Sequence, residues 1–539
     1  MRIGLFGNTN NYPLMLAVAL RGLGHDAVLV VNRPELLHRP ESKYPEWKGA
    51  YPEWVLDCSH LPEAEFAALS PAIEPVLDFL TLGSHALIVN DLGPSLLDLC
   101  GDIPTVALLT GSDVTYYANP ESVEVRLRGT SQDFRASARG RLTEQRAREF
   151  VDRQRSGIRG ARVVSAPWPG LAPSLDAVLA DIGVDPARRT FVFMADVERT
   201  AAHAPSKNRE ATRLRIVNGA RLNWKKPLPP GFSSMDHKGT DILLEGFAQF
   251  RAAGGDADLV LFRKGLHIAE TEQLAQTLGV SDRIIWREEA SHETFWREIV
   301  AADIVCDQFG DSFPAMVALD AMALARPVVA NFPEAMSARF PVPIPACHAS
   351  TPSEVADHFI ALARSEATRR HIGAAAQRFT HEYLSPTAAA VHLLAYPGVL
   401  SAAQRERVQI AARLRAVAER AGSATITTDD ALSQSGVADA WRAITLRPED
   451  MRKEHGHGWT WRLPPNVPPG DRSGDHRSLT LLLENLCPLG PVHSLHDAIR
   501  SRGGGRYSHW EERLYFSTSD NSDPRTNSRI YTAITRTTS

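Results

Sequence analysis

The stretch "ADIVCDQFGDSFPAMVALDAMALARPVVAN", residues 302–331, decides the fold. Short β-branched runs at 303–307 and 327–331 flank an apolar stretch with helical spacing, so the sequence predicts a strand, a helix and a second strand. Two strands joined through a helix pair in parallel. This order is typical of a doubly wound α/β sheet.

The helix of this stretch carries a single acid in its apolar run. Pro314 suits the first turn of a helix, and Ser312 can cap it. Val317 and Asp320 then lie one and two turns along the face that begins at Pro314. An unpaired carboxylate inside an apolar helix is costly, so Asp320 needs a partner or a ligand.

The same alternation of strands and helices runs through the first 400 residues. The predicted strands are 2–6, 26–31, 86–90, 104–109 and 161–165, then 214–219, 258–262, 283–286, 303–307 and 327–331. The polar, pattern-poor segment 196–213 between the two sets is interpreted as a linker. We therefore expect two doubly wound Rossmann-like domains with a cleft between them.

The domain prediction has four parts. They are an N-terminal acceptor-binding domain (1–200), a donor-binding domain (201–400), a helical connector (401–449) and an accessory module (450–539). The last part is rich in tryptophan, proline, glycine and short β-type runs, so we expect it to be β-rich.

The composition narrows the function classes. The chain has 539 residues and a net charge of −4, which gives no electrostatic reason to expect nucleic acid as a partner. The first residues lack the pattern of a signal peptide, and no run approaches the roughly 20 apolar residues of a membrane span. Five scattered cysteines without a C-x-x-C pair indicate reduced thiols and no cysteine-rich zinc site. These features favour a cytoplasmic protein, and no cofactor is predicted.

The first loop, "GNTNNYP" at 7–13, follows the first predicted strand. Ligands of open α/β sheets bind outside the carboxyl ends of strands, so the loop is well placed for a ligand. Asn8, Asn10 and Asn11 offer amide groups to a polyhydroxylated acceptor. Ordinary turn chemistry explains them equally well, because Asn tolerates turn conformations.

A second loop, within "LLTGSDVTYY" at 108–117, places Gly111, Ser112 and Asp113 at the same edge. Asp113 is a candidate catalytic carboxylate that would bind a sugar hydroxyl. The alternative is that it caps the following helix.

In the second half, two basic residues follow the same logic. Arg221 comes just after the strand 214–219, and Lys238 comes immediately before a glycine and a predicted helix. Cations beside a helix N-terminus suit a pyrophosphate. The alternative is that both are solvated surface charges.

The start of the Asp320 helix completes this candidate donor site. Backbone amides near 311–315 would bind anionic or hydroxyl groups, and a carboxylate can accept two hydroxyls of a ribose at once. The alternative is a structural acid, half buried against an arginine. The candidate donor-binding residues are Asp311, Ser312, Phe313, Pro314, Ala315 and Asp320.

"DHKGTDILLEGF" followed by "ADIVCDQFGDSFPAMVALDAMALARPVVAN" is similar to the C-terminal half of family 4 glycosyltransferases of the GT-B fold. By position, Arg221 and Lys238 match the pair that holds the donor pyrophosphate, and Asp320 matches the second Glu of a Glu-x7-Glu motif, the ribose ligand. The chain departs from the motif in three places. Asp320 is one methylene shorter than Glu, Ser312 stands eight residues before it beside Asp311, and Ala325 replaces the usual Gly.

The resemblance implies a retaining, metal-independent transfer of a sugar from a nucleotide-sugar donor to a glycan or glycolipid acceptor in bacterial surface-polysaccharide or lipopolysaccharide assembly. It implies no transmembrane segment, but admits peripheral association with the inner face of the membrane. The only D-x-D, at 256–258, precedes a strand and is interpreted as a solvated turn. Two alternatives remain: a non-catalytic scaffold that binds glycan or protein, which the altered motif favours, and a nucleotide-sugar epimerase.

The C-terminal region is dense in polar and aromatic residues: His493, His496, Asp497, His509 and Trp510. Imidazole and carboxylate groups suit several divalent ions, so a metal site is one interpretation. Glycan or partner binding is another. We favour structural hydrogen bonding.

Overall fold

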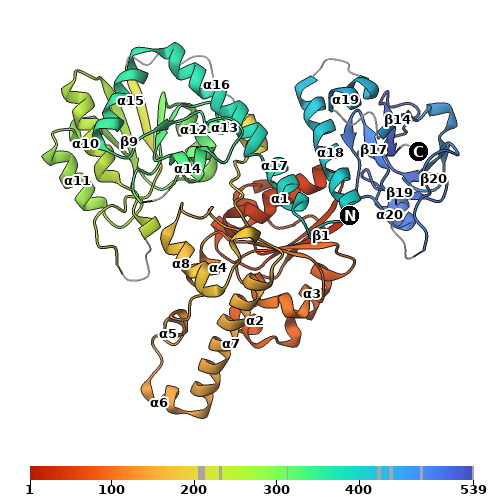
Figure 1. The fold of residues 1–539 in the computed structure, drawn as a ribbon, viewed down its shortest axis with the longest axis horizontal. Helices are drawn as coiled ribbons and strands as arrows, with labels where there is room; N and C mark the ends of the chain where they lie inside the picture. Colours follow the sequence, from red (N-terminus) through yellow and green to blue (C-terminus); the bar gives the residue numbers. More distant parts are fainter. Residues whose placement is uncertain are drawn as a thin grey trace. The chain divides into compact units, whose positions relative to one another are not determined.

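The computed structural model describes residues 1–203, 213–229, 234–311, 313–421, 427–435, 441–473 and 478–536. The chain divides into two compact units (Figure 1). The first unit comprises Met1–Pro40, Glu46–Ser165 and Ala390–Ser539, and the second comprises Glu41–Pro45 and Ala166–Ala389. The polar segment 196–213 predicts a domain boundary at residue 200, whereas the compact units divide after Ser165. The composition of a segment does not reveal which unit the chain around it packs against.

The first parallel sheet has seven strands in the order β3-β2-β1-β4-β5-β6-β7. They are β1 Arg2–Phe6, β2 Asp26–Val31, β3 Val55–Asp57, β4 Ala86–Val89, β5 Thr105–Leu108, β6 Val163–Ser165 and β7 Arg189–Thr190. β1 pairs in parallel with β2 on one side and β4 on the other, so the order reverses there. The central strands are buried on both faces, which is why they appear in the sequence as continuous apolar runs.

Helices connect these strands. Those of the first unit before residue 166 are α1 Tyr12–Gly22, α2 Glu63–Ala68, α3 Glu74–Thr81, α4 Ser112–Thr115, α5 Ser122–Arg126, α6 Gln132–Ala136 and α7 Ala138–Gly160. The long helix α7 runs out from the sheet and packs against α5 and α6 at its far end (Figure 1).

The second sheet has six parallel strands in the order β10-β9-β8-β11-β12-β13. They are β8 Leu214–Asn218, β9 Ala257–Phe262, β10 Ile284–Arg287, β11 Ile304–Cys306, β12 Val328–Ala330 and β13 Cys347–His348. The helices of the second unit are α8 Pro173–Ile182, α9 Val197–Thr200, α10 Thr240–Ala252, α11 Ile268–Thr277, α12 His292–Val300, α13 Met316–Ala323, α14 Glu334–Ser337, α15 Pro352–Arg364 and α16 Glu366–Tyr383.

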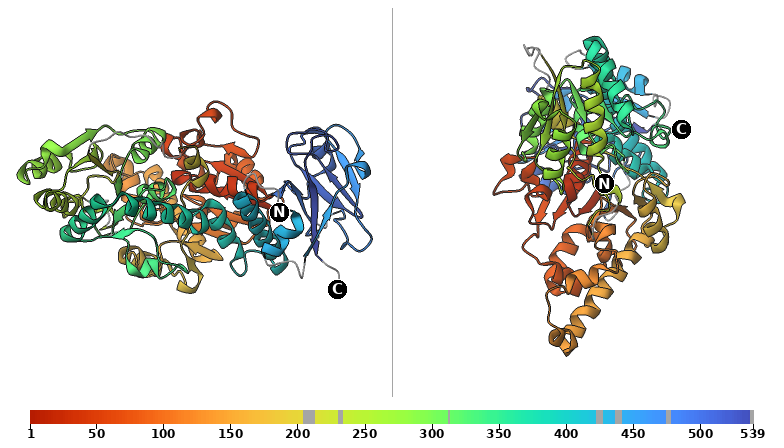
Figure 2. Two further views of the ribbon diagram at one scale, coloured as in Figure 1. Left: turned by 90° about the horizontal axis from the view of Figure 1, so that it is seen from above. Right: turned by 90° about the vertical axis from the view of Figure 1, so that its left-hand side faces the viewer.

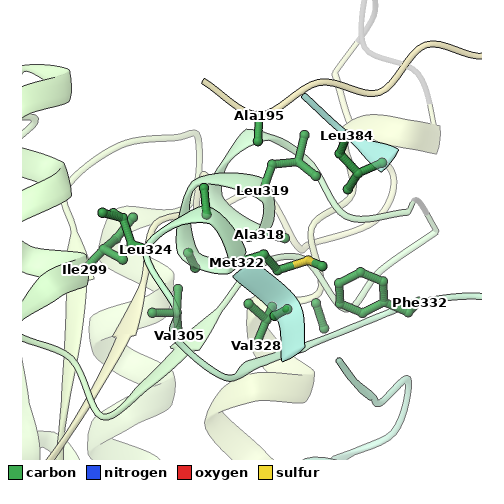
Figure 3. Close-up of a cluster of buried hydrophobic side chains, with 14 of the residues drawn as sticks. Ala195, Ile299, Val305, Ala318, Leu319, Met322, Leu324, Val328, Phe332 and Leu384 are labelled. Atoms are coloured by element: carbon green, nitrogen blue, oxygen red, sulfur yellow. The ribbon is translucent and has the colours of Figure 1, made fainter. Parts of the chain in front are cut away.

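Helix α13 lies at the centre of a hydrophobic core in this unit. Its residues Ala318, Leu319 and Met322 pack among the side chains of β11, β12 and α12 (Figure 3). Burying this apolar face stabilises the helix and fixes the position of Asp320, which lies in the same turn as Leu319.

Residues 441–536 form a β module of two antiparallel four-stranded sheets. Their orders are β14-β21-β17-β18 and β15-β16-β20-β19. The strands are β14 Trp441–Thr445, β15 Arg452–Lys453, β16 Trp459–Arg462, β17 Leu481–Glu484, β18 Cys487–Pro488, β19 Tyr507–Trp510, β20 Arg513–Phe516 and β21 Tyr531–Arg536, and the helix is α20 His496–Ser501.

Helices before the module pack against it. These helices are α18 Ala402–Ala421 and α19 Thr428–Ser435, and α17 Pro386–Ala395 precedes them. Residues of α18 and α19 share one hydrophobic cluster with Trp441 of β14, Leu483 of β17 and Leu23 of the N-terminal domain. Figure 2 shows these helices beside the module. The module is therefore part of the first unit.

The predicted class, two doubly wound parallel sheets with a smaller β-rich module, is confirmed. Each of the ten predicted strands is present, while the short strands β3, β7 and β13 escaped prediction. The expected linker at 196–213 is helical at α9, and residues 204–212 lie outside the described residues. Across the parts of the chain that the structure describes, no helix is long and apolar enough to cross a membrane.

Candidate functional site

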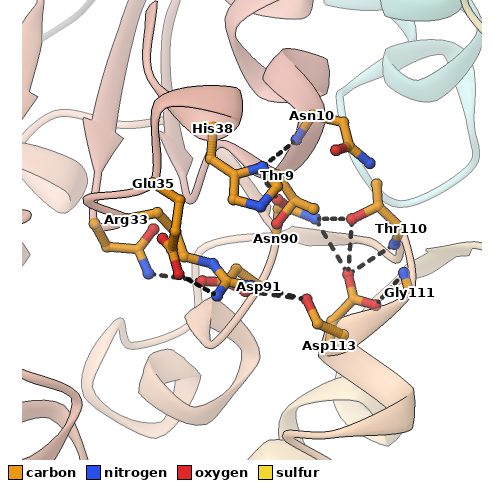
Figure 4. A network of polar contacts seen from close by, with 12 residues as sticks. Thr9, Asn10, Arg33, Glu35, His38, Asn90, Asp91, Thr110, Gly111 and Asp113 are labelled. Carbon is orange, nitrogen blue, oxygen red and sulfur yellow. Dashed lines mark hydrogen bonds and ion pairs between the residues drawn. The ribbon is translucent and has the colours of Figure 1, made fainter. Parts of the chain in front are cut away.

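The reversal of strand order between β1 and β4 marks the place where open α/β sheets bind ligands. The loops after β1, β2, β4 and β5 meet there in a network of polar contacts (Figure 4). At its centre, Asn90 accepts a hydrogen bond from the Thr9 amide at 2.9 Å and donates to the Leu108 carbonyl at 2.7 Å. The predicted first-half residues surround this point.

Two of the three predicted asparagines hold the first loop together. Asn8 and Asn11 are fully buried, and Asn8 Nδ2 donates to Asn11 Oδ1 at 2.7 Å. Asn8 Oδ1 accepts from the Leu14 amide, and Asn11 Nδ2 donates to the Leu37 carbonyl. Asn10 is partly exposed; its backbone amide donates to His38 Nδ1, and its side chain has no hydrogen-bond partner among the described residues. Asn10 is thus the asparagine whose amide group is free for a ligand.

Asp113 lies in the first turn of α4 and is fully buried. Its carboxylate accepts backbone hydrogen bonds from Thr110 at 2.7 Å, Gly111 at 2.9 Å and Val114 at 3.1 Å. Burial raises the pKa of this carboxyl group to about 7, although these hydrogen bonds favour the ionised form. The N-cap of α4 is Gly111, without a side-chain cap, so Asp113 binds the preceding loop from inside the first turn and is not the cap of our alternative. Its catalytic role stays a prediction.

A second acid of this network, Asp91, was not among the predicted site residues. It is fully buried, accepts from Asn32 Nδ2 at 2.7 Å and forms an ion pair with Arg33 at 3.2 Å. Burial raises its pKa against the opposing charge of Arg33. A signal for these residues existed, because Asn32 and Arg33 directly follow β2 and Asp91 follows β4.

In the second sheet the order reverses between β8 and β11. The loops that follow these strands are in close contact: the Phe309 amide donates to the Lys238 carbonyl at 2.8 Å. Gly239 has a φ of 68°, and a Cβ there would lie 2.6 Å from the Gly310 nitrogen. Only glycine fits this approach, which brings the start of α10 to the loop after β11.

Arg221 and Lys238 both lie in the loop after β8. Lys238 is mostly buried, and its Nζ donates to the Met235 carbonyl at 2.7 Å. Burial lowers its pKa, the charges of Asp307 and Asp236 oppose this, and the charge of Arg221 lowers it further. The Arg221 side chain is exposed and makes no hydrogen bond or ion pair to any residue that the structure describes. The loop therefore carries two cations, and the guanidinium of Arg221 is exposed to solvent.

The start of α13 differs from the prediction. The helix begins at Met316, so Pro314 precedes it instead of forming its first turn. The buried carboxylate of Asp307, which the sequence analysis missed, accepts from the Ala315 amide at 2.6 Å and the Ala318 amide at 3.3 Å. The expectation that the Ala315 amide is open to a donor phosphate is therefore wrong, because Asp307 occupies it. A signal existed, since Asp307 ends a predicted strand.

The other predicted donor residues have separate environments. Asp311 is exposed and forms an ion pair with Lys226 at 2.5 Å. Phe313 is buried against the rings of Phe191 and Phe193, and Pro314 is buried. Ser312 lies outside the described residues.

Asp320 is 3% exposed. Its Oδ2 accepts from Trp296 Nε1 at 2.9 Å, whereas its buried Oδ1 has no hydrogen-bond partner in the described parts of the chain. Burial raises its pKa to about 6, while the charge of Lys43 favours the ionised form. Lys43 itself forms a buried ion pair with Asp196 at 2.8 Å. The partner of Asp320 is a tryptophan, not the arginine of our structural alternative, and one oxygen remains unpaired.

The polar residues of the C-terminal module form hydrogen bonds among themselves. His493 Nδ1 lies 2.5 Å from Asp471, and His509 Nδ1 lies 2.7 Å from Ser478 Oγ. His496 stacks on the Tyr515 ring, and its ring also meets that of Trp510 edge-on. Asp497 is exposed and pairs with Arg500. Over the ranges that the structure describes, no three His, Cys, Asp or Glu side chains gather as a metal site, here or in the α/β sheets.

No family model matches this chain, and no curated protein is similar to it. Among solved structures, it is similar to HepE of Anabaena in complex with UDP-glucose, at 14% identity over 73% of this chain and 98% of that chain, with a TM-score of 0.45. It is also similar to a glycosyltransferase of Rickettsia africae at 12% identity over 74% and 99%, with a TM-score of 0.47. A third is WaaG, a glycosyltransferase of lipopolysaccharide biosynthesis, at 12% identity over 74% and 100%, with a TM-score of 0.41. TM-scores below 0.5 carry no functional assignment.

The two sheets therefore differ in what their carboxyl edges can do chemically. The first presents a polar loop network with one free amide, on Asn10. The second presents an open guanidinium, a desolvated ammonium and a buried carboxylate with an unpaired oxygen. The cations suit a diphosphate, and the carboxylate suits hydroxyl donors.

Proposed function

We propose that this chain is a glycosyltransferase that takes a sugar from a nucleotide-sugar donor and transfers it to a glycan or glycolipid acceptor. The donor binds at the carboxyl edge of the second sheet, and the acceptor binds at that of the first. The transfer is retaining and metal-independent, and it takes place in the cytoplasm during surface-polysaccharide assembly.

One observation carries this proposal: Arg221 and Lys238 lie together where the second sheet reverses its strand order. Open α/β sheets bind their ligands at such points. An exposed guanidinium without a protein partner forms a bidentate contact with a phosphate at little cost. The desolvated ammonium of Lys238 acts as a fixed point charge on the second phosphate.

The proposed chemistry follows from this placement. As the bond between the sugar and the diphosphate breaks, negative charge develops on the departing diphosphate. The loop contact through Gly239 holds the Lys238 backbone in place, so this charge acts without rearranging, and the exposed Arg221 guanidinium contacts the same diphosphate. Asp320 Oδ1 accepts from a ribose hydroxyl, and the donor phosphate takes the acceptor proton.

A non-catalytic scaffold is the second candidate. Asp307 occupies the amide of Ala315 that we expected to be open to a donor, which favours this alternative. Such a protein would bind a glycan or a protein partner without turning over any sugar nucleotide.

A donor screen separates the two functions. The purified chain is incubated with a panel of UDP-, GDP- and dTDP-sugars, and hydrolysis and transfer are read by mass spectrometry. We expect turnover of at least one donor and a loss of about 100-fold or more in Arg221→Ala and Lys238→Ala. Arg370→Ala, at an exposed arginine of α16 that pairs with Glu366, serves as the control and keeps full activity. Absence of turnover together with calorimetric binding of a polysaccharide but no sugar nucleotide would establish the scaffold instead.

A further inference from the structure

A pocket of about 330 Å³ lies within the first unit, between the N-terminal domain and the C-terminal β module. On the domain side it is lined by Arg2 and Asp26 at the starts of β1 and β2, and by Trp54 just before β3. On the module side it is lined by residues 491–495 and by residues in and after α20. The pocket thus lies at the amino edge of the first sheet, opposite the network of Figure 4.

Direct contacts hold the two walls of this pocket together. A Cβ on Gly490 would lie 2.6 Å from the Gly24 Cα, so the two backbones touch. Glu53 of the N-terminal domain pairs with Arg502 at 3.0 Å and with Arg506, both from the module. The pocket is therefore a built feature of the unit.

The lining is strongly basic. Its charged side chains are Arg2, Arg21, Asp26, Glu53, Arg502 and Arg506. Asp26 pairs with Arg2 at 2.7 Å and lies 3.6 Å from Arg21, and Glu53 pairs with the other two arginines. Four guanidinium groups against two carboxylates leave a net charge of +2 on the lining.

Many donors on these arginines are unused. A guanidinium has five N–H donors, whereas Arg2 donates to Asp26 and to the Phe79 carbonyl only. Its Nε is buried and has no partner among the residues described. Burial lowers the pKa of Arg21 and the charges of Arg506 and Arg2 lower it further, while the charges of Asp26 and Glu53 raise it. An anion in the pocket would add negative charge beside these cations and accept from the guanidinium donors that face it.

The rest of the wall is mainly apolar. Val28, Trp54, Phe79, Val492 and Leu495 contribute apolar surface, and His493 and Ser494 are its polar residues. The Arg21 guanidinium lies 5.0 Å from the centre of the Trp54 ring, so this cation is held in place by an aromatic face. The volume is at the lower end of the roughly 300–1,000 Å³ of small-molecule sites. The pocket therefore has space and contacts for a carbon skeleton as well as for an anionic group.

We propose that this pocket binds a small organic phosphate monoester. A phosphate monoester carries a charge of about −1.5 to −2 near pH 7, which matches the net charge of the lining. Arginine forks form bidentate hydrogen bonds with phosphate oxygens, and the apolar wall contacts the organic part. This site is separate from the proposed donor site and does not rest on the proposed transferase activity.

Isothermal titration calorimetry on the full chain tests the proposal. The probes are glucose 1-phosphate, inorganic phosphate and glucuronate, which separate the monoester from the bare ion and from a carboxylate. We expect the monoester to bind most tightly and to bind about 10-fold more weakly in Arg502→Gln and in Arg506→Gln. Arg513→Gln, an exposed arginine of β20 outside the pocket, should bind like the unaltered protein.

Two further measurements keep the result specific. Lys238→Ala should retain the binding, since that residue belongs to the second unit. The Arg502 side chain is 61% exposed, so Arg502→Gln should melt at the same temperature as the unaltered protein. If Arg506→Gln fails to fold, the result for Arg502→Gln decides the test. The proposal is overturned if the monoester does not bind, if it binds no better than inorganic phosphate or glucuronate, or if binding depends on Lys238 and not on Arg502.

Discussion

The carboxyl edges of the two parallel sheets have the same reversal of strand order but carry different polar side chains. At the first edge, the buried residues Asn8, Asn11 and Asp113 use their polar atoms to hold the loops. At the second edge, the Arg221 guanidinium is open and Asp320 Oδ1 has no partner within the described ranges. Buried polar atoms without a partner among the described residues occur at both edges, Thr9 Oγ1 and Asn32 Oδ1 at the first and Asp320 Oδ1 at the second. The second edge differs in its cations, the exposed Arg221 guanidinium and the desolvated Lys238 ammonium. We therefore expect the first edge to be mainly scaffold and the second to bind the donor.

The largest expected effect is at the second edge. Lys238→Ala removes a fixed charge from beside the leaving diphosphate, so we expect turnover to fall about 100- to 1,000-fold, or about 2.7–4 kcal/mol of transition-state stabilisation. The melting temperature should change little, because the Lys238 ammonium makes one hydrogen bond, to Met235. Steady-state kinetics and a thermal melt check this together. A variant that loses stability in proportion to activity would show instead that this edge is scaffold too.

The second effect concerns the first edge. Asp113→Ala removes the side-chain acceptor of the Thr110 and Gly111 amides and one of the two acceptors of the Val114 amide, which also donates to the Gly111 carbonyl. We expect the free energy of unfolding to fall by about 2–3 kcal/mol, measured by urea denaturation. Asp133→Ala, at an exposed position of α6, is the control and should change it by less than about 0.5 kcal/mol. If Asp113→Ala keeps its free energy of unfolding but loses sugar transfer, Asp113 is catalytic. The first edge would then take part in the reaction as well as the second.

A third effect is on pH dependence at Asp320. Its pKa in the folded chain is about 6, above the ordinary aspartate value of 3.8, so the folded state binds this proton more tightly than the unfolded state. Stability from this proton is fully present below about pH 4 and is lost as the pH rises through 6. Donor affinity should change in the opposite sense, because ribose hydroxyls donate to the ionised form. We expect about tenfold tighter donor binding at pH 7 than at pH 5, measured by calorimetry.

Asp320→Asn is the matched control for this pH effect. The amide keeps the shape of the side chain but does not titrate, so its donor affinity should be weaker and nearly flat between pH 5 and 7. The same slope in the variant would assign the titration to another group. His292, which packs on Trp296, is not that group, because burial lowers its pKa to about 4.

The sequence predicted the parts of this molecule that depend on local patterns. Central parallel strands are continuous apolar runs, so β1 and β2 were predicted with their actual bounds. The two-residue strands β7 and β13 are too short to carry a pattern. Arg221, Lys238 and Asp320 stood out because they follow a strand, precede a helix or interrupt an apolar face.

Local sequence patterns did not predict the contacts between residues that are far apart in the sequence. Lys43 pairs with Asp196 across 153 positions, and Trp296 reaches Asp320 from another helix. Nothing local distinguishes Lys43 from any other lysine. Its burial, and hence its effect on Asp320, depends on how the segment Glu41–Pro45 is incorporated into the second unit.

The smallest effect is expected at Asn10, whose partly exposed side-chain amide has no hydrogen-bond partner among the described residues. Asn10 has a φ of 54°, so Asn10→Gly removes the side chain without straining the backbone. We expect unfolding free energy to stay within about 0.5 kcal/mol and the KM for the acceptor to rise about two- to fivefold, the value of one hydrogen bond, with kcat unchanged. Asn8→Gly, which breaks three hydrogen bonds of the loop, should instead lower stability. If Asn10→Gly leaves the acceptor KM unaltered, the first edge contributes only scaffold, and the acceptor must be recognised by other residues.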